Sequence, residues 1–242
     1  MRKASTSREA NSPIVGIFGP HLAVSITNRC PIQCEHCVSS STPFTPKGRE
    51  GLELSLSNFL VSNHGYNHVT LTGGEPFDCL DKLFEFAKIC NAHRIKYGTI
   101  TSAFWAKSES SARQALEHTP DIFSMTISTD IYHSAFIKPR FLKNAYLAAK
   151  ELGAHTKIRL TRNNECKKSD ILKDQLNEFV SDDDLEICQL VPYGRAENVH
   201  SDLTKTGQYY GKCPTSGPHI FEDGRITPCC NSIVSLRKHE FF

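Results

Sequence analysis

Short apolar or β-branched runs alternate along the chain with longer stretches of helical periodicity. The short runs predict six strands, at residues 22–27, 67–72, 97–102, 122–128, 156–161 and 185–191. The longer stretches predict helices at 54–63, 79–93, 108–118, 136–152 and 169–180. A repeating strand–helix order predicts a parallel sheet with right-handed crossovers. Ligand sites in such sheets lie at the carboxyl ends of the strands.

Local signals mark several boundaries of these elements. Gly153 follows the fourth predicted helix as an expected C-terminal cap, and Ser169-Asp170 carries capping chemistry for the start of the fifth. Near the carboxyl terminus, Asp223-Gly224 stands between two short apolar segments and predicts a hairpin over 221–226.

Composition bounds the class of protein. The chain has 242 residues, of which 39% are hydrophobic and 22% charged, so it can bury a substantial core. A net charge of +2 with interspersed signs gives no case for a nucleic-acid partner. The amino terminus lacks the apolar core of a secretory signal, and we find no apolar run of about 18 residues. We therefore expect a cytoplasmic protein with no membrane partner.

Three cysteines follow the first predicted strand in a CxxxCxxC spacing, at Cys30, Cys34 and Cys37. Iron–sulfur clusters are usually held by four thiolates, so three leave one iron open to a substrate or cofactor. Structural zinc is an alternative, with His36 as a possible further ligand. Disulfides would need an oxidising compartment, and a chance spacing is the remaining alternative.

A second motif follows the second predicted strand. The run His68-Val69-Thr70-Leu71-Thr72 ends in Gly73-Gly74-Glu75-Pro76. Paired glycines let the backbone approach a ligand closely or adopt positive φ. Taken alone, this sequence would be an ordinary turn.

The two motifs together resemble those of the radical S-adenosylmethionine (radical SAM) superfamily. The resemblance implies an α/β fold, a partial (βα)6 TIM-like barrel, with a small cysteine-rich C-terminal extension. It also implies that Cys30, Cys34 and Cys37 bind a 4Fe–4S cluster whose fourth iron chelates SAM. The family usually carries an aromatic residue at the position of His36, where a flat imidazole could also pack against adenine.

The same resemblance suggests further cofactor-binding positions at the strand ends. The motif Gly73, Gly74, Glu75 and Pro76 would hold the methionine amino group of SAM, largely through its backbone. Other candidates are Thr101-Ser102 after the third strand, Ser128 and Asp130 after the fourth, Arg159 and Arg162 at the fifth, and Tyr193 within Leu190–Ala196. For Ser128 and Asp130 a helix cap is an equal alternative, turn chemistry is one for Thr101-Ser102, and at least one arginine is expected to be solvated.

The carboxyl-terminal cysteines form another constellation. Cys213, Gly224 and Cys229 stand in a C-x10-G-x4-C arrangement, followed by Cys230. This resembles the opening half of the SPASM or twitch extension of radical SAM enzymes and implies an auxiliary Fe–S cluster. Without a further cysteine-rich segment downstream, we expect one such cluster rather than two. A zinc ribbon is the alternative.

The remaining cysteines divide into two groups. Cys79 and Cys90 fall on a predicted helix, where small buried residues are expected. Cys166 lies after the fifth strand beside two lysines that would lower the pKa of its thiol. We assign Cys166 a catalytic role as a hydrogen-atom donor to a substrate radical, with an inert surface thiol as the alternative.

The expected activity is reductive cleavage of SAM to a 5′-deoxyadenosyl radical, which abstracts a hydrogen from substrate. The resemblance implies that the substrate is a ribosomally made peptide, which is crosslinked or epimerised. Alternatives are a dehydrogenase or epimerase acting on a small molecule such as a sugar, and a non-catalytic Fe–S or zinc scaffold. An electron donor such as flavodoxin or ferredoxin is the expected partner. We divide the chain into an arm at 1–20, the core at 21–197 and the auxiliary region at 198–242.

Overall fold

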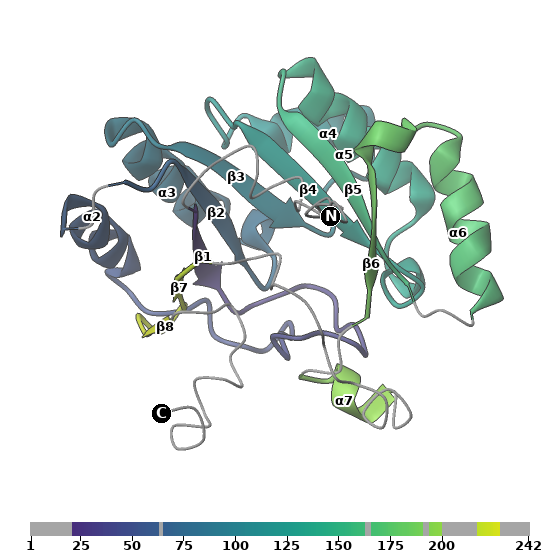
Figure 1. The fold of residues 1–242 in the computed structure, drawn as a ribbon, viewed down its shortest axis with the longest axis horizontal. Coiled ribbons are helices and arrows are strands. Elements are labelled where there is room, and N and C mark those ends of the chain that lie inside the picture. The colour runs from purple at the N-terminus through teal and green to yellow at the C-terminus, as the bar shows by residue number, and fades with distance from the viewer. Residues whose placement is uncertain (1–20, 63–64, 163–165, 191–193, 200–216, 228–242) are drawn as a thin grey trace, which may run out of the picture.

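The computed structural model describes residues 21–62, 65–162, 166–190, 194–199 and 217–227. Their strands form one eight-stranded sheet in the order β6-β5-β4-β3-β2-β1-β7-β8. The first six strands run parallel, each paired with its sequence neighbour. Figure 1 shows these strands fanned into an open arc, with helices along its outer side. The predicted partial barrel is confirmed, and its sheet is not closed.

The boundaries of the six core strands lie close to those expected from sequence. They are β1 His21–Thr27, β2 His68–Gly73, β3 Lys96–Thr101, β4 Ser124–Thr129, β5 His155–Arg162 and β6 Leu185–Gln189. The α-helices between them are α2 Leu52–Ser62, α3 Leu80–Ala92, α4 Glu109–Leu116, α5 Pro139–Glu151 and α6 Lys167–Asn177. Short 3-10 turns occupy Pro76–Asp78, His133–Ala135 and Asp182–Asp184, and α7 spans Ala196–Val199.

Two capping predictions have different outcomes. Gly153 has a φ of +77° and its N–H bonds to the carbonyl of Lys150, so it ends α5 as expected. The prediction that Ser169-Asp170 starts α6 is wrong, because the helix begins at Lys167 after Cys166. Ser169 is instead fully buried within the first turn, and its N–H donates to the Cys166 carbonyl.

Each strand presents different chemistry to its two faces. Leu22, Val24 and Ile26 of β1 are fully buried in the hydrophobic core, which helices α3 and α5 cover from outside. The alternate residues Ala23 and Ser25 line a cavity on the inner face. The same division separates Val69 and Leu71 from Thr70 and Thr72 on β2, and Met125 and Ile127 from Thr126 and Ser128 on β4. The period of two along a strand therefore builds an apolar outer core and a hydroxyl-rich interior.

The predicted carboxyl-terminal hairpin is present and extends the core sheet. Strands β7 (His219–Ile220) and β8 (Ile226–Thr227) are antiparallel, and Gly224 in their turn has a φ of +85°. Strand β7 pairs in parallel with β1 on the edge opposite β2. The described part of the expected auxiliary region thus joins the sheet of the core, and the boundary at 197/198 stays a prediction.

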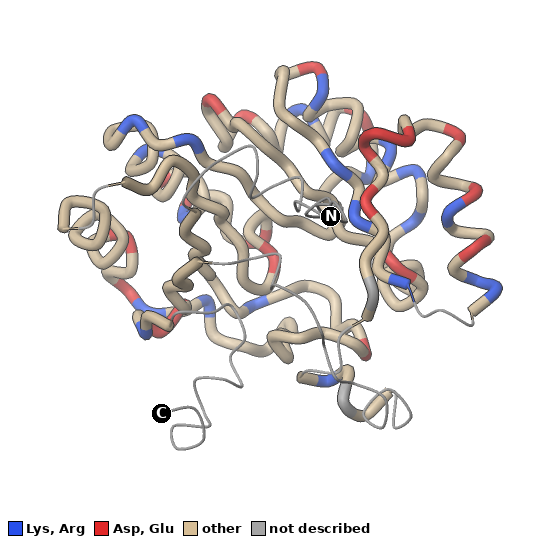
Figure 2. The backbone as a smooth tube through the Cα atoms, viewed as in Figure 1, with Lys and Arg blue, Asp and Glu red and all other residues tan. Residues whose placement is uncertain are grey.

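Charged residues are spread over the outer helices (Figure 2), and some, including Arg159 on β5 and Glu186 on β6, line the inner cavity. Figure 2 shows Lys and Arg interspersed with Asp and Glu along α6. Among the described residues, no helix is long and apolar enough to cross a membrane.

Candidate active site

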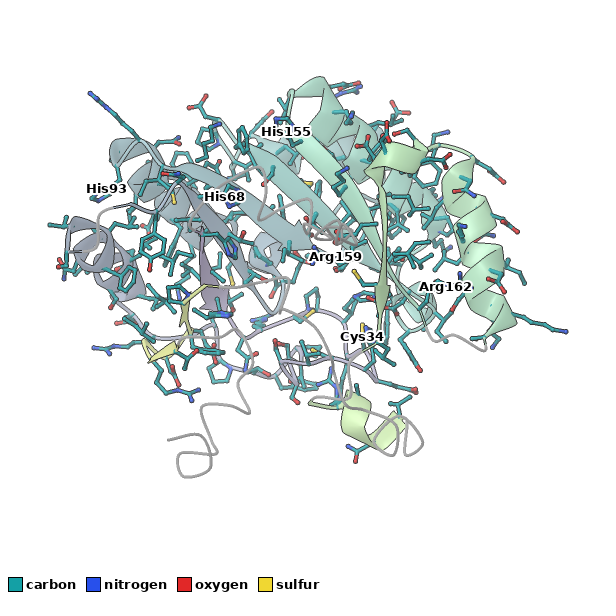
Figure 3. All side chains as sticks on the ribbon, viewed as in Figure 1. Cys34, His68, His93, His155, Arg159 and Arg162 are labelled. Carbon is teal, nitrogen blue, oxygen red and sulfur yellow. The ribbon has the colours of Figure 1, made fainter. Side chains whose placement is uncertain are left out.

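The three motif cysteines lie on one loop at the carboxyl end of β1. Cys30 and Cys34 are buried, Cys37 is half-buried, and none forms a disulfide. All three line the inner cavity, whose volume is about 830 Å³. In Figure 3, β5 runs from His155 through Arg159 to Arg162, and the loop with Cys34 lies near the end where the strands finish. The cysteines are therefore at the edge of the sheet that the sequence predicted.

Arginine and glycine from beyond β6 hold this loop in place. The Arg195 guanidinium donates from Nε to the Cys34 carbonyl (2.9 Å) and from Nη1 to the Ser41 carbonyl (2.8 Å). Its backbone N–H donates to the Cys37 carbonyl (3.0 Å). A Cβ on Gly194 would lie 2.4 Å from the Val38 carbonyl oxygen, so only glycine permits this approach. Arg195 is a site residue that was not predicted from the sequence, where its position directly after Gly194 was the available signal.

The chemistry of the loop suits a bound cation. Burial, then the nearby Glu75 carboxyl, and the other two thiols raise the pKa of Cys30 well above its usual value. Thiolates this close together repel one another unless positive charge lies among them. Metal ions supply such charge and deprotonate coordinating thiols. Three soft donors on one loop fit an Fe–S cluster.

The glycine motif docks directly against the cysteine loop. The N–H of Gly74 donates to the Thr27 carbonyl and that of Glu75 to the Arg29 carbonyl, both at 2.8 Å. A Cβ on Gly74 would lie 2.1 Å from the Arg29 oxygen. An ammonium group only donates hydrogen bonds, so at this segment it would bind carbonyl oxygens.

Glu75 ties the end of β2 to the end of β3. One carboxylate oxygen accepts from the Thr101 hydroxyl (2.8 Å) and the Phe77 N–H (3.2 Å). The other accepts from the Ser102 N–H (2.8 Å) and hydroxyl (2.6 Å). Burial raises the pKa of Glu75, while these four bonds oppose the shift. Thr101 and Ser102 also line the cavity, so their assignment as cofactor contacts stays a prediction.

Asp130 forms the centre of a buried polar cluster. Its Oδ1 accepts hydrogen bonds from the N–H groups of Tyr132 (2.8 Å) and His133 (2.9 Å). Asp130 therefore caps the turn that follows it, which was the alternative to a cofactor-binding role in the sequence. Its Oδ2 accepts from His133 Nδ1 (2.7 Å) and His36 Nε2 (2.8 Å). Burial would raise the pKa of Asp130, but the two histidines outweigh burial and hold that pKa far below its usual value.

The two arginines of β5 have different surroundings. Arg159 lines the cavity and pairs with Glu186 of β6, at 3.0 Å from both Nε and Nη2. Arg162 pairs with Asp170, whose side chain is 62% exposed. Arg159 therefore remains the stronger candidate for a carboxylate of cofactor or substrate. Ser128 lines the same cavity and donates to the Thr101 carbonyl.

The other predicted site residues either do not line the cavity or fall outside the residues that the structure describes. Pro76 is buried at the start of the turn after Glu75, and half-buried Cys166 precedes α6 without contributing to the cavity lining. Cys79 and Cys90 are buried, as expected. Four candidates fall outside the described residues, namely Tyr193, Cys213, Cys229 and Cys230.

Histidines occupy the opposite end of the cavity, at the amino ends of the strands. His21 opens β1, His68 opens β2 and His219 opens β7. Burial lowers the pKa of His68 and His219 to about 4, with a smaller contribution from the His21 side chain, and burial also lowers that of His21. These rings are therefore neutral at neutral pH, and His219 Nε2 bonds to the Ser25 hydroxyl at 2.7 Å.

Comparison with known proteins agrees with the motifs. Residues 19–130 match the family of 4Fe-4S single cluster domains. The Bacillus subtilis protein YydG, whose name refers to peptide biosynthesis, is 22% identical over 231 residues, covering 90% of this chain and 71% of YydG.

Two solved structures show the same fold. Streptococcus suis SuiB bound to its precursor peptide SuiA superposes with a TM-score of 0.60 at 16% identity, covering 89% of this chain and 60% of that one. The structure of anSMEcpe with AdoMet and the Cp18Cys peptide superposes with a TM-score of 0.56 at 14% identity. The match covers 87% of this chain and 73% of that chain. Residues 19–130 therefore carry a 4Fe-4S single cluster domain, and the chain has the fold of SuiB and anSMEcpe, in agreement with the superfamily that the motifs indicated.

Substitution of Gly74 tests the docking of the two motifs. In Gly74→Ala, the new methyl group overlaps the Arg29 carbonyl, so we expect a stability loss of about 1–3 kcal/mol and lower iron retention after anaerobic reconstitution. Thermal unfolding and iron analysis measure both. Gly51→Ala is the control for the overlap alone, because its φ of +77° strains an added side chain while no atom lies within 4 Å of the added Cβ. Equal iron retention in the two variants would contradict the docking interpretation.

The buried histidines at the amino ends of the strands, His21, His68 and His219, predict that the folded protein loses stability at acidic pH. A histidine whose pKa falls from 6.5 to about 4 on folding binds more protons when unfolded, so its contribution to stability declines as pH drops below 6.5. For His219 the loss between pH 7 and pH 5 is about 2 kcal/mol. We expect His219→Gln to lose correspondingly less than wild type in anaerobic denaturant titrations at the two pH values. His118→Gln, which lies outside the cavity, should lose as much stability between pH 7 and pH 5 as wild type does. If His219→Gln also lost as much as wild type, the acid sensitivity could not be assigned to His219.

Proposed function

We propose that this chain is a radical SAM enzyme that cleaves SAM reductively and abstracts a hydrogen atom from a ribosomally made peptide, forming a crosslink or an epimer. The observation that carries the proposal is the docking of the CxxxCxxC loop against Gly74 and Glu75 at one end of a cavity of about 830 Å³. A pocket of this size is near the upper end of the range for ligands, about 300–1,000 Å³. It has room for a cofactor and part of a substrate.

Cys30, Cys34 and Cys37 are the proposed cluster ligands. When bound, a 4Fe–4S cluster in this class supplies the electron that cleaves SAM to the 5′-deoxyadenosyl radical. The chain orients the ligands through Arg195 and through the bonds that link Gly74 and Glu75 to residues of the same loop. Enclosure of the site in the half-barrel would keep water from a reactive intermediate.

The chain offers complementary groups for SAM around the cavity. Backbone carbonyls of the Gly73–Glu75 segment are proposed to receive the methionine ammonium, because an ammonium group donates hydrogen bonds and accepts none. Arg159 carries the positive charge suited to a carboxylate, although Glu186 competes for it. Ser128 and Ser102 supply hydroxyls on the cavity wall.

Several finer assignments belong to the same proposal. The names of YydG and of the peptide-bound SuiB and anSMEcpe structures support a peptide substrate over a small molecule. A flavodoxin or ferredoxin would deliver the electron in the cytoplasm, and no nucleic acid or membrane is required. Cys213, Cys229 and Cys230 would hold one auxiliary cluster, and Cys166 would donate a hydrogen atom.

Loss of one ligand tests the central site. Cys34→Ala removes a buried thiol from the proposed set, so we expect dithionite-dependent formation of 5′-deoxyadenosine to fall to background. Anaerobic reconstitution followed by chromatographic quantification of the nucleoside measures this. Cys90→Ala is the matched control, because Cys90 is fully buried on α3 and does not line the cavity. Cleavage of SAM by Cys34→Ala would contradict the assignment of Cys34 as a cluster ligand.

The substrate class is tested with peptides. We expect reduced enzyme and SAM in deuterated water to add one deuteron per epimerised residue, or to remove two hydrogens per crosslink, in candidate precursor peptides. Mass spectrometry with fragmentation locates the change. A sugar panel in the same assay covers the alternative. Modification of a sugar, with the peptides untouched, would overturn the peptide assignment while leaving SAM cleavage intact.

A further inference from the structure

We propose that the amino end of the cavity is a recognition subsite for a primary carboxamide, the side chain of Asn or Gln in a peptide substrate. The inference rests on the proposed function, because it takes the substrate to be a peptide. The subsite lies at the end of the sheet away from the cysteine loop, as the positions of His68 and Cys34 show in Figure 3.

Two histidine–hydroxyl pairs form the subsite. His21 Nε2 lies 3.2 Å from the Thr70 hydroxyl, and His219 Nε2 lies 2.7 Å from the Ser25 hydroxyl. All four residues line the cavity, and both histidines and Ser25 are more than nine-tenths buried. Within the part of the chain that the structure describes, the Nδ1 atom of each histidine has no hydrogen-bond partner. Each pair therefore has hydrogen-bonding capacity to spare inside the cavity.

A count of protons shows what each pair can bind. A neutral imidazole has one N–H and one acceptor nitrogen, and a hydroxyl has one donor proton and an acceptor oxygen. One proton lies in the bond within the pair, whichever partner donates it. Each pair therefore keeps one donor and one acceptor for a ligand. Burial lowers the pKa of both histidines and so keeps their rings neutral at neutral pH.

The strand register sets the two pairs on either side of Ala23. Ala23 is paired with Thr70 of β2 and with His219 of β7. Neighbouring strands are about 4.8 Å apart, so the backbones of Thr70 and His219 are separated by about 10 Å. The small Ala23 methyl group leaves space between them. A carboxamide carries a donor and an acceptor on one rigid plane and can bond to both pairs, whereas a hydroxyl is too short to do so.

A third pair extends the polar floor across the sheet. His68 Nε2 lies 3.1 Å from the Ser124 hydroxyl, and the rings of His68 and His21 are stacked with centroids 6.0 Å apart. Gly98 of β3 is paired with Ser124, and a Cβ on Gly98 would lie 2.0 Å from the Ser124 hydroxyl oxygen. The missing side chain at Gly98 therefore lets Ser124 reach toward His68.

The charge of the subsite favours a neutral ligand. The described lining residues of β1, β2 and β7 carry no formal charge at neutral pH. The carboxylates that line the cavity lie elsewhere, with Glu75 after β2 and with Asp184 and Glu186 at β6. A buried carboxylate ligand would lack a counter-ion on these strands, and an aliphatic ligand would leave the donors unpaired.

The depth of the subsite relates it to the reacting end of the cavity. Ala23 precedes Thr27, the last residue of β1, by four residues, a distance of about 13 Å along the strand. An extended peptide that reacts near the cysteine loop would place its carboxamide within about four residues of the reacting position. The subsite would thereby select both the sequence and the register of the substrate.

The first test measures binding of three acetylated and amidated tripeptides that carry Asn, Leu or Asp between two glycines. The reconstituted protein is kept oxidised and ¹⁵N-labelled at histidine, and nuclear magnetic resonance follows the ring nitrogens, assigned through His21→Gln and His219→Gln. We expect the Asn probe to shift both rings and to bind about tenfold more tightly than the Leu probe, which is of similar size.

Three results would overturn the inference. One is the absence of any shift of the two rings with the Asn probe. Another is an equal response to all three probes, as expected if only water fills the subsite. The third is tightest binding of the Asp probe, which would identify an anion site instead.

The second test removes one hydroxyl from each pair. Thr70→Val and Ser25→Ala should each weaken binding of the Asn probe about tenfold and leave that of the Leu probe unchanged. The control is Thr119→Val, because Thr119 is buried and donates to the Leu116 carbonyl but does not line the cavity. Undiminished preference for the Asn probe in both folded variants would contradict the assignment. If neither variant folds, the comparison of probes on wild type decides.

Failure of the proposed function would be recognised separately. Binding of the probes is measured without reductant and needs no turnover, so it does not depend on cleavage of SAM. Absence of 5′-deoxyadenosine from reduced wild type would overturn the proposed function. Its formation together with unshifted His21 and His219 would overturn this inference alone.

Discussion

The candidate site depends on two backbone hydrogen bonds, from Gly74 to Thr27 and from Glu75 to Arg29. They join segments that lie more than forty residues apart in the sequence and are possible because Gly74 has no side chain to separate them. Glu75 then extends the junction to β3 through Thr101 and Ser102. The ends of three neighbouring strands are thereby locked together around the loop that carries the cysteines.

Much of the fold follows from local patterns in the sequence. The six core strands were predictable because short β-branched runs alternate with helical periods, and the hairpin was predictable from Asp223-Gly224. The start of α6 was not, because Cys166 begins it without a side-chain cap while Ser169 turns inward. Pairing of β7 with β1 was also missed, since a two-residue strand carries no sign of its partner.

The site divides in the same way between local and long-range information. Spacing identified Cys30, Cys34 and Cys37, because one loop contains them all. Residue spacing gave no indication that Asp130 bonds His36, or that Arg195 reaches the Cys34 and Ser41 carbonyls. Those contacts depend on how the loop after β1 folds over the ends of β4 and β6. Only the three-dimensional arrangement contains that information.

Attachment of β7 to the free side of β1 has a consequence for how the cysteine loop is supported. Ala23 and Val24 pair with His219 and Ile220, and β1 continues without interruption to the loop that begins before Cys30. A hairpin that leads toward Cys229 in the sequence is therefore anchored to the strand that delivers Cys30. Displacement of the hairpin would be transmitted along β1 to the loop that carries the first thiol. The hairpin of β7 and β8 thus acts as a brace for the first strand, so its loss would disturb the ligand loop even if no second metal centre were lost.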